Sequence, residues 1–545
     1  MPEFSLIGLL DPHREVAGFV GRGPELGELL AWCADGQDAP VRLVIGSAGV
    51  GKTRLAVEFA RRMRLRGWRS EWLGVGRAAS LTGLTGLAGA PEATPILHRK
   101  SLVIIDDADR RDGLADLLVD LAKTQPQTRI LLLAPDAGGW CDQLELAGPV
   151  AHALVTAARS ALIDLSREVD EHLTDAELAG LAAVAFATEL ARPSWSVELA
   201  SQPAPGLRPM LDLHIAALVA VASGSPGPVT LPLAASELLG LERRVWVGRA
   251  EALGIAADPR LLGQLVAAAL LLGAATPEDA AAVVVRVTES SGPAALATWL
   301  LGTASASAGP ANTVLANTVL ANTVLANTGP SDINHQYPAW PRGLAELHIA
   351  TELTGEPEFA RRCLTDLDPT RLVRAVRLLA PAGASDQPRS RPPESALHLV
   401  ADQLEKLEAP APALIAVLDA LPYPQPMWAQ AGAAICDRIV AQLGPAADQG
   451  TRAYWLNSLS ARLWLAGRQR EAASAAEEAV TIRRELAAQA PDRYLASLAL
   501  SLSYLGIQYA GLDRKADAVK VTQEATSVRR KLAAADPQRY ALLDE

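Results

Sequence analysis

The stretch Gly46-Ser47-Ala48-Gly49-Val50-Gly51-Lys52-Thr53 decides the fold of the first part of this chain. It fits the Walker A pattern G-x-x-x-x-G-K-[ST], whose glycines let backbone N–H groups curl around phosphate oxygens. The β-prone run 41–45 precedes it, and residues 53–66 contain neither glycine nor proline, which favours a helix. Strand, glycine-rich turn and helix is the context that a P-loop requires. We therefore predict that all eight residues bind a nucleotide, although a glycine turn beside a surface lysine remains the alternative.

Two adjacent aspartates are the candidates for the metal-binding part of this site. The apolar run 101–105 ends in Asp106 and Asp107. In a P-loop protein Lys52 would reach the β- and γ-phosphates, and the Thr53 hydroxyl would ligate Mg²⁺ near Asp106. Asp107 would orient or activate the attacking water, so Lys52 and Asp107 are the candidate catalytic residues. Ordinary turn residues after a core strand are the alternative for the two aspartates.

Composition narrows the classes of protein to consider. The chain has 545 residues, which predicts two to four domains, and its net charge is -11. That charge makes nucleic acid an unexpected partner for the whole chain. The four cysteines are scattered, no apolar run is long enough to span a membrane, and the N-terminus has no signal-peptide pattern. A cytoplasmic protein with reduced thiols is expected.

Apolar runs alternate with helical patterns as far as residue 165. Strands are expected at residues 68–75, 101–105, 129–133 and 161–165, in addition to the run before the loop. Strands that alternate with helices predict an α/β domain with a mainly parallel sheet.

The order of three motifs resembles a known family. Phe19-Val20-Gly21-Arg22, then the P-loop, then a strand ending in Asp-Asp is similar to the signal-transduction ATPases with numerous domains (STAND), relatives of the NB-ARC and AAA-type ATPases. The resemblance implies ATP or ADP with Mg²⁺. It also implies a nucleotide-side role for Val20, Gly21 and Arg22, close to the adenine and ribose. A helix-leading turn with Gly21 at the bend is the alternative.

One departure from the family concerns hydrolysis. Relatives often carry an arginine that senses the γ-phosphate after the strand at 129–133, but this chain has Ala134-Pro135-Asp136. Proline carries no charge and cannot replace that arginine. The sequence therefore supports nucleotide binding better than fast hydrolysis, and a slow Mg-dependent ATPase is expected if the chain is an enzyme. Arg110 and Arg111 follow the acidic pair and are possible substitutes.

The middle of the chain is expected to be helical. The resemblance implies a helical lid with a winged-helix-like element over residues 166–305. Residues 242–246 read as a charged, solvated helix face. Residues 306–341 include Ala-Asn-Thr-Val-Leu repeats with a period of five, which fits neither a helix nor a strand and predicts a low-complexity linker.

The last hundred residues repeat internally. Arg483-Arg484-Glu485-Leu486 recurs as Arg529-Arg530-Lys531-Leu532, and Pro491-Asp492-Arg493-Tyr494 recurs as Pro537-Gln538-Arg539-Tyr540, an offset of 46 residues. Helices are expected at residues 456–466, 470–487, 498–510 and 515–534. Paired helices with small residues at packing positions resemble long tetratricopeptide (TPR) repeats, which present a face to peptides or partner proteins. A helical hairpin pair without a partner is the alternative.

Together the sequence predicts a multidomain protein: an α/β P-loop NTPase with a parallel sheet, an all-α lid region and α-α repeats. The expected segments are an N-terminal lead (1–18), the NTPase core (19–165), the lid region (166–305), the linker (306–341), a helical region (342–445) and TPR-like repeats (446–545). This combination looks like an actinobacterial-type STAND ATPase with TPR repeats.

The sequence is compatible with three functions to different degrees. The first is a nucleotide-gated switch, closed with ADP and opened by a partner and ATP, which permits homo-oligomers to form. The second is a TPR interaction scaffold with a non-hydrolysing, pseudo-ATPase site, which Pro135 favours. The third, a transcription regulator, requires a basic helix-turn-helix that neither end of the sequence contains.

Overall fold

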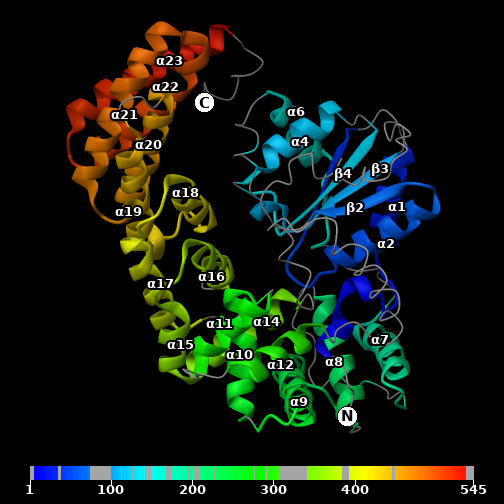
Figure 1. Ribbon diagram of the computed structural model, residues 1–545. Coiled ribbons are helices and arrows are strands. Elements are labelled where there is room, and N and C mark those ends of the chain that lie inside the picture. The colour runs from blue at the N-terminus through cyan, green and yellow to red at the C-terminus, as the bar shows by residue number, and fades with distance from the viewer. Residues whose placement is uncertain are drawn as a thin grey trace, which may run out of the picture. The chain divides into compact units, whose positions relative to one another are not determined.

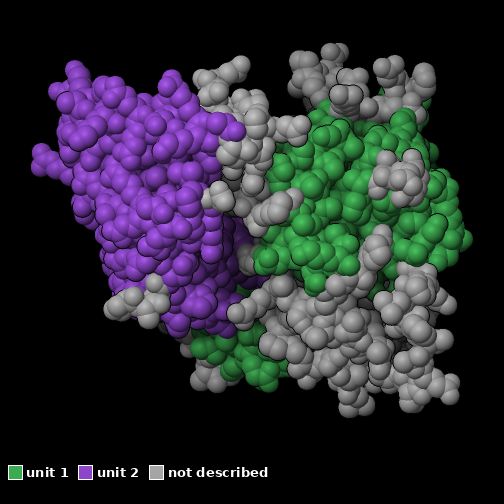
Figure 2. All heavy atoms as spheres, turned by 90° about the horizontal axis from the view of Figure 1, so that it is seen from above, with its two compact units in different colours: residues 1–349 green, residues 350–545 purple. Residues whose placement is uncertain are grey.

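The computed structural model describes most of the chain as two compact units, residues 1–349 and 350–545 (Figure 2). The residues described are 5–34, 39–73, 100–111, 113–124, 127–138, 140–141, 144, 149–166, 173–193, 197, 199, 209–224, 228–256, 258–274, 276–288, 293–305, 340–382, 392–444 and 448–535. Most of the predicted linker, residues 306–339, lies outside this set. The structure establishes an α/β domain followed by helices, while the finer domain boundaries remain predictions.

A five-stranded sheet forms the centre of the α/β domain. Its strands are β1 (Val41–Ile45), β2 (Arg69–Leu73), β3 (Ser101–Ile105), β4 (Thr128–Ala134) and β5 (Ile163–Asp164). The order across the sheet is β2-β3-β4-β1-β5, and every neighbouring pair is parallel. The predicted parallel sheet is therefore confirmed. The strand expected at residues 161–165 is only two residues long.

Helices cover both faces of this sheet (Figure 1). One face packs on α1 (Gly23–Ala34) and α2 (Lys52–Leu65), the other on α4 (Leu114–Thr124) and α6 (Pro149–Ser160). Side chains alternate between the two cores along each strand, so Ile104 faces α2 while Ile105 faces α4. Burial on both faces explains why β3 and β4 are nearly continuous apolar runs, whereas β2, at the edge of the sheet, is not.

The rest of the first unit is helical. It contains η1 (Ile7–Leu10), η2 (Pro12–Arg14), α7 (Asp175–Glu189), α8 (Met210–Ser223), α9 (Leu231–Ala252), α10 (Pro259–Leu272), α11 (Pro277–Thr288), α12 (Ala294–Ser305) and the start of α14 (Arg342–Gly355). Apart from an isolated bridge between Leu199 and Val229, the described residues between 173 and 305 contain no β structure. The predicted winged-helix element has no further support among them.

The N-terminal lead is part of this helical core. The apolar side chains of Ile7 and Leu9 are buried against α7, α8 and α9. Glu242 of α9 accepts hydrogen bonds from the backbone N–H groups of Leu6 (2.7 Å) and Ile7 (3.3 Å). Glu242 is only 1% exposed, so the prediction of a solvated face at residues 242–246 is wrong for this residue. The described residues of the lead from 5 to 10 are therefore part of the core of the helical region.

The second unit is a succession of helices. They are α15 (Pro357–Leu364), α16 (Pro369–Ala382), α17 (Glu394–Lys406), α18 (Ala411–Ala420), α19 (Pro426–Gln442), α20 (Gln449–Leu465), α21 (Gln469–Gln489), α22 (Pro491–Gly511) and α23 (Lys515–Ala535). From α19 onward each helix packs against the next one in the chain (Figure 1). No helix in the described part of either unit is long and apolar enough to cross a membrane.

The last four helices are the two pairs that the internal repeat predicts. A common core of small and branched side chains joins α21, α22 and α23, including Ala473, Leu502 and Ala525. Helix α22 begins at Pro491, not near residue 498, because proline is well tolerated in the first turn of a helix. The long repeat unit therefore reflects long helices.

Candidate functional site

The predicted P-loop connects β1 to α2, and its glycines adopt backbone angles that other residues avoid. Gly46, Gly49 and Gly51 have φ values of 151°, 79° and 107°. A Cβ at Gly46 would lie 2.9 Å from Val50 Cγ1, and one at Gly49 would lie 3.0 Å from Leu211 Cβ. Backbone conformation therefore favours glycine at all three positions, and limited space favours it as well at Gly46 and Gly49.

Lys52 is bent over this loop. Its Nζ donates to the carbonyl oxygens of Gly46 (2.6 Å) and Ser47 (3.1 Å). Burial lowers the pKa of Lys52, while the nearby carboxylates of Asp106, Asp107 and Asp109 oppose that shift. The ammonium group thus lies at the centre of the loop, with acceptors supplied by the protein itself.

The predicted metal-side residues meet in the structure. The Thr53 hydroxyl donates to Asp106 Oδ2 at 2.8 Å, although β4 lies between β1 and β3 in the sheet. Burial and the neighbouring Asp107 raise the pKa of Asp106. The described residues contain no cluster of three or more His, Cys, Asp and Glu side chains that could hold a metal ion. One hydroxyl and one carboxylate fit Mg²⁺, which commonly takes few protein ligands and completes its shell with phosphate oxygens and water.

Asp107 and Pro135 flank the loop in different ways. Asp107 has a left-handed backbone (φ 48°), and its N–H donates to Asp106 Oδ1 at 3.0 Å. Its carboxylate is close enough to Lys52 to affect the lysine electrostatically. The Pro135 carbonyl accepts from the Gly46 N–H at 3.2 Å, so the end of β4 supports the loop through its backbone. A water-activating role for Asp107 remains a prediction.

Arg110 and Arg111 are the possible replacements for a sensor arginine, and the structure describes the side chain of Arg111 alone of the two. Arg111 is a buried residue, 8% exposed, and the Arg110 side chain lies outside the described set. Neither observation assigns them a contact with phosphate.

The Val20-Gly21-Arg22 segment forms a turn before α1. Gly21 has a φ of 79°, which agrees with the alternative of a bend at this glycine. Arg22 is 3% exposed and donates to the Leu165 carbonyl and to Glu25, both at 2.8 Å. The arginine thereby fixes the turn to the end of β5. A role of these three residues beside the nucleotide is still a prediction.

A contact that sequence reasoning missed joins the loop to the helical region. The Leu211 N–H, in the first turn of α8, donates to the Gly49 carbonyl at 3.0 Å. The side chains of Pro209 and Leu211 leave no room for a Cβ at Gly49. No local sequence pattern reports a contact between residues so far apart. The start of α8 is therefore in direct contact with the loop.

Comparisons with known proteins give little further information. No protein-family model matches the chain, and no curated protein matches it. Among solved structures, the chain is similar to a STAND protein with a tetratricopeptide repeat sensor from Pyrococcus horikoshii. That match has 13% identity and a TM-score of 0.23, and covers 96% of this chain and 85% of the other. A similarity this weak carries no argument about function, and nothing in the comparisons supports the actinobacterial type.

Proposed function

We propose that this chain is a nucleotide-gated switch, an ATP/ADP-binding signalling ATPase of the STAND type with a TPR-like tail that binds a protein partner. One observation carries the proposal: the Thr53 hydroxyl bonds Asp106 beside a loop in which Gly46, Gly49 and Gly51 have positive φ and over which Lys52 is bent. The proposal includes slow Mg-dependent hydrolysis and a cytoplasmic location.

The described residues fit a nucleotide in chemical terms. Lys52 would hold the phosphates, together with the N-terminus of α2 and the loop N–H groups other than those of Gly46 and Val50, which donate to Pro135 and Ser47. Thr53 and Asp106 would hold Mg²⁺, which supplies positive charge against the phosphate oxygens. Phosphate oxygens would also compete with the Gly46 and Ser47 carbonyls for Lys52.

The contact between Gly49 and Leu211 gives the switch a physical basis. A change in the loop reaches α8 directly, because the two segments share a hydrogen bond and a packed surface. ADP and ATP differ by the γ-phosphate, so they can shift the equilibrium only as far as their affinities for the two states differ. The proposal therefore requires a measurable difference between ADP-bound and ATP-bound protein.

The first test is nucleotide content and turnover of the purified full chain beside Lys52→Ala. We expect wild type to retain ADP or to hydrolyse ATP slowly with Mg²⁺. Lys52→Ala should weaken nucleotide binding by roughly a hundredfold or more, because it removes the charge-assisted hydrogen bonds to phosphate. Lys123→Ala, an exposed lysine in the last turn of α4, is the matched control and should behave as wild type.

Two results would count against the proposal. Wild type that binds no nucleotide would remove its basis. If the protein has the same hydrodynamic size with ADP and with ATP, the proposals of a switch and of a nucleotide-dependent homo-oligomer are wrong. The proposal of nucleotide binding would still stand.

The second candidate is a TPR scaffold with a non-hydrolysing site. It is favoured by Pro135, whose carbonyl supports Gly46 at the position where relatives often carry an arginine. Wild type that binds ATP but does not turn it over, in the presence of Mg²⁺, would select this candidate.

A further inference from the structure

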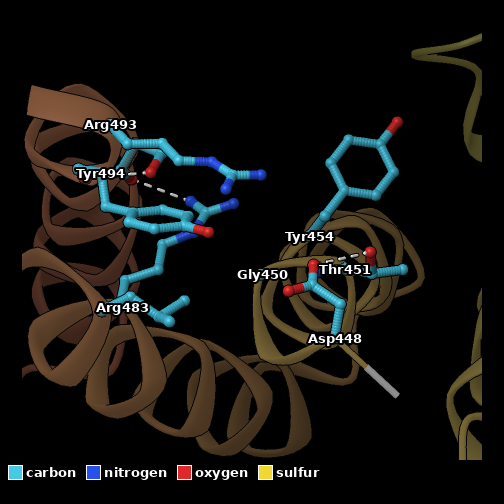
Figure 3. A pocket seen from close by; sticks show the side chains of 9 residues that line it. Asp448, Gly450, Thr451, Tyr454, Arg483, Arg493 and Tyr494 are labelled. Atoms are coloured by element: carbon cyan, nitrogen blue, oxygen red, sulfur yellow. Dashed lines mark hydrogen bonds between the residues drawn. The ribbon is translucent and has the colours of Figure 1, made fainter. Parts of the chain in front are cut away.

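A cavity of about 320 Å³ opens where α20, α21 and α22 meet in the second unit. Its lining combines the N-terminal end of α20, the C-terminal half of α21 and the first turns of α22 (Figure 3). Two of the lining residues are Arg483 and Arg493, and Asp448 is the one acidic residue among those that line it. The cavity therefore carries more positive than negative charge.

Arg483 is a buried cation in this wall. It is 7% exposed, and its Nη1 donates to the Ser497 carbonyl at 2.8 Å and to the Ser501 hydroxyl. Both acceptors are neutral, and no described carboxylate lies within ion-pair distance. Burial lowers the pKa of Arg483. A guanidinium has five N–H donors in a fixed fork, so Nε and Nη2 are left for a ligand.

Arg493 extends from α22 toward α20 (Figure 3). Its guanidinium carbon lies 5.1 Å from the centre of the Tyr494 ring. Within the described chain the Arg493 side chain makes neither a hydrogen bond nor an ion pair, although it is close enough to Asp448 to lower the pKa of that carboxyl group. Tyr454 of α20 lies across from Arg493, with its hydroxyl directed away from that guanidinium, and is 58% exposed. The outer part of the cavity thus combines a second guanidinium with the Tyr494 ring.

Asp448 only partly offsets this charge. It caps α20 by accepting from the Thr451 N–H (2.9 Å) and hydroxyl (3.0 Å). Two guanidinium groups against one carboxylate leave the cavity with a single unit of positive charge. A buried charge without a counter-ion is unfavourable, so binding one anionic group would stabilise the cavity.

We propose that this cavity binds a carboxylate of an acidic peptide segment in a partner protein. A carboxylate matches the surplus of one charge and accepts two parallel hydrogen bonds from a guanidinium, whereas a doubly charged phosphate would exceed it. The whole chain carries a net charge of -11 and repels acidic peptides, so their capture requires a local site of this kind. The inference rests on the proposed partner-binding role of the tail.

The cavity also accounts for the internal repeat. Arg483, Leu486, Arg493 and Tyr494 line it, and all four belong to the segments that recur 46 residues later. A duplicated set of residues that lines a cavity points to a role beyond the packing of helices.

The test is binding of a fluorescein-labelled hexaglutamate peptide to the full chain, measured by fluorescence anisotropy at low salt. Arg493→Gln should weaken binding about tenfold, the scale of one charge-assisted hydrogen-bonded contact. Arg484→Gln is the matched control and should change affinity less than about twofold. It removes the same charge next to Arg483, where the guanidinium is exposed and already paired with Glu524 at 2.6 Å. Arg493 is exposed, so its replacement should leave folding intact, and circular dichroism verifies this.

Four results would overturn the inference. They are no hexaglutamate binding, unchanged binding after Arg493→Gln, equal weakening by Arg493→Gln and Arg484→Gln, and much tighter binding of a phosphoserine peptide than of hexaglutamate. Lys52→Ala should bind hexaglutamate as wild type does, which excludes the loop as the peptide site. Failure of the cavity leaves nucleotide binding untouched, so the two proposals fail separately. Peptides that bind the tail equally well after Arg493→Gln would keep the interaction role and reject this cavity.

Discussion

Lys52 in the first unit and Arg483 in the second are both largely buried cations, but their surroundings differ. Lys52 donates hydrogen bonds to two backbone carbonyls, and three nearby aspartates interact with it electrostatically. Arg483 has a backbone carbonyl and a serine hydroxyl, with no carboxylate in ion-pair distance among the described residues. The protein supplies the negative charge in one case and leaves it out in the other.

This difference indicates how each site would respond to a ligand. An anion that enters the loop would displace acceptors that Lys52 already has, and Mg²⁺ would offset the charges of Asp106 and Asp107. Binding there is therefore coupled to rearrangement. An anion that enters the tail cavity only adds a missing counter-ion, so the cavity is expected to bind without reorganising its wall.

After that of Lys52→Ala, the largest expected effect comes from replacing an aspartate beside Lys52. Asp106→Asn removes a carboxylate that would hold Mg²⁺ and that repels phosphate when the metal is absent. We expect the Mg²⁺ enhancement of ADP binding to fall on the order of tenfold to hundredfold, while metal-free ADP binding is unchanged or tighter. Titrations of fluorescent ADP with Mg²⁺ and with EDTA measure both quantities.

The control for this variant is Asp437→Asn, an exposed aspartate of α19 in the second unit. It should leave the Mg²⁺ enhancement at its wild-type value. If Asp106→Asn retained the full enhancement, the assignment of Asp106 to the metal, and with it the contrast between the two cations, would be lost.

A smaller effect is expected from the packing between the C-terminal ends of α20 and α22 in the tail. Gly511 ends α22, and a Cβ there would collide with the ring of Trp464 on α20. Gly511→Ala should lower the free energy of unfolding of the second unit by about 1 to 3 kcal/mol, as overpacking usually does. Urea unfolding followed by tryptophan fluorescence measures this change.

Gly355→Ala serves as the comparison for Gly511→Ala. It lies at the end of α14, where nothing stands within 4 Å of an added Cβ. It should be neutral or slightly stabilising, because alanine favours a helix over glycine. Equal effects of the two replacements would mean that contact between α20 and α22 does not limit the stability of the tail.

The smallest effect concerns Glu242, a buried acidic residue, in contrast to the buried basic residue Arg483. Burial raises the pKa of Glu242 above its usual 4.5. The folded chain then holds this proton more tightly than the unfolded chain does. The corresponding stability is present below pH 4.5 and is lost as the pH rises through the raised pKa. Relative to Glu242→Gln, wild type should therefore be more stable near about pH 4 than near about pH 8.

Urea unfolding of both proteins at the two pH values tests this expectation. The difference between them cancels the titration of all other groups. A difference that is independent of pH would show that the N–H groups of Leu6 and Ile7 stabilise the ionised carboxylate enough to offset its burial.

The sequence predicted those elements whose structure depends on neighbouring residues. The glycines of residues 46–53 and the apolar run before Asp106 placed the loop, two strands and α2 correctly, because each depends on neighbouring residues. The start of α22 at Pro491 could also have been predicted, since proline favours the first turn.

The remaining features depend on contacts between distant segments. Glu242 looked like part of a solvated face because its partners, two backbone N–H groups, belong to residues 6 and 7 and have no sequence signature. The hydrogen bond between Leu211 and Gly49 is equally invisible in the sequence. The repeat revealed which residues recur in the tail, but only the packing of α20, α21 and α22 brings Arg483 and Arg493 to one cavity.

The position of that cavity has a consequence for how such a tail could be tuned. Arg483 belongs to one repeat unit and Arg493 to the next, so the cavity belongs to the joint between units and not to either one. Lengthening the array by one 46-residue copy would add one joint, and with it one more anion-binding cavity at a fixed spacing. A ligand with acidic residues at that spacing would occupy two joints at once, and its avidity would multiply because the second contact is intramolecular. The number of copies would then set how long a partner stays bound.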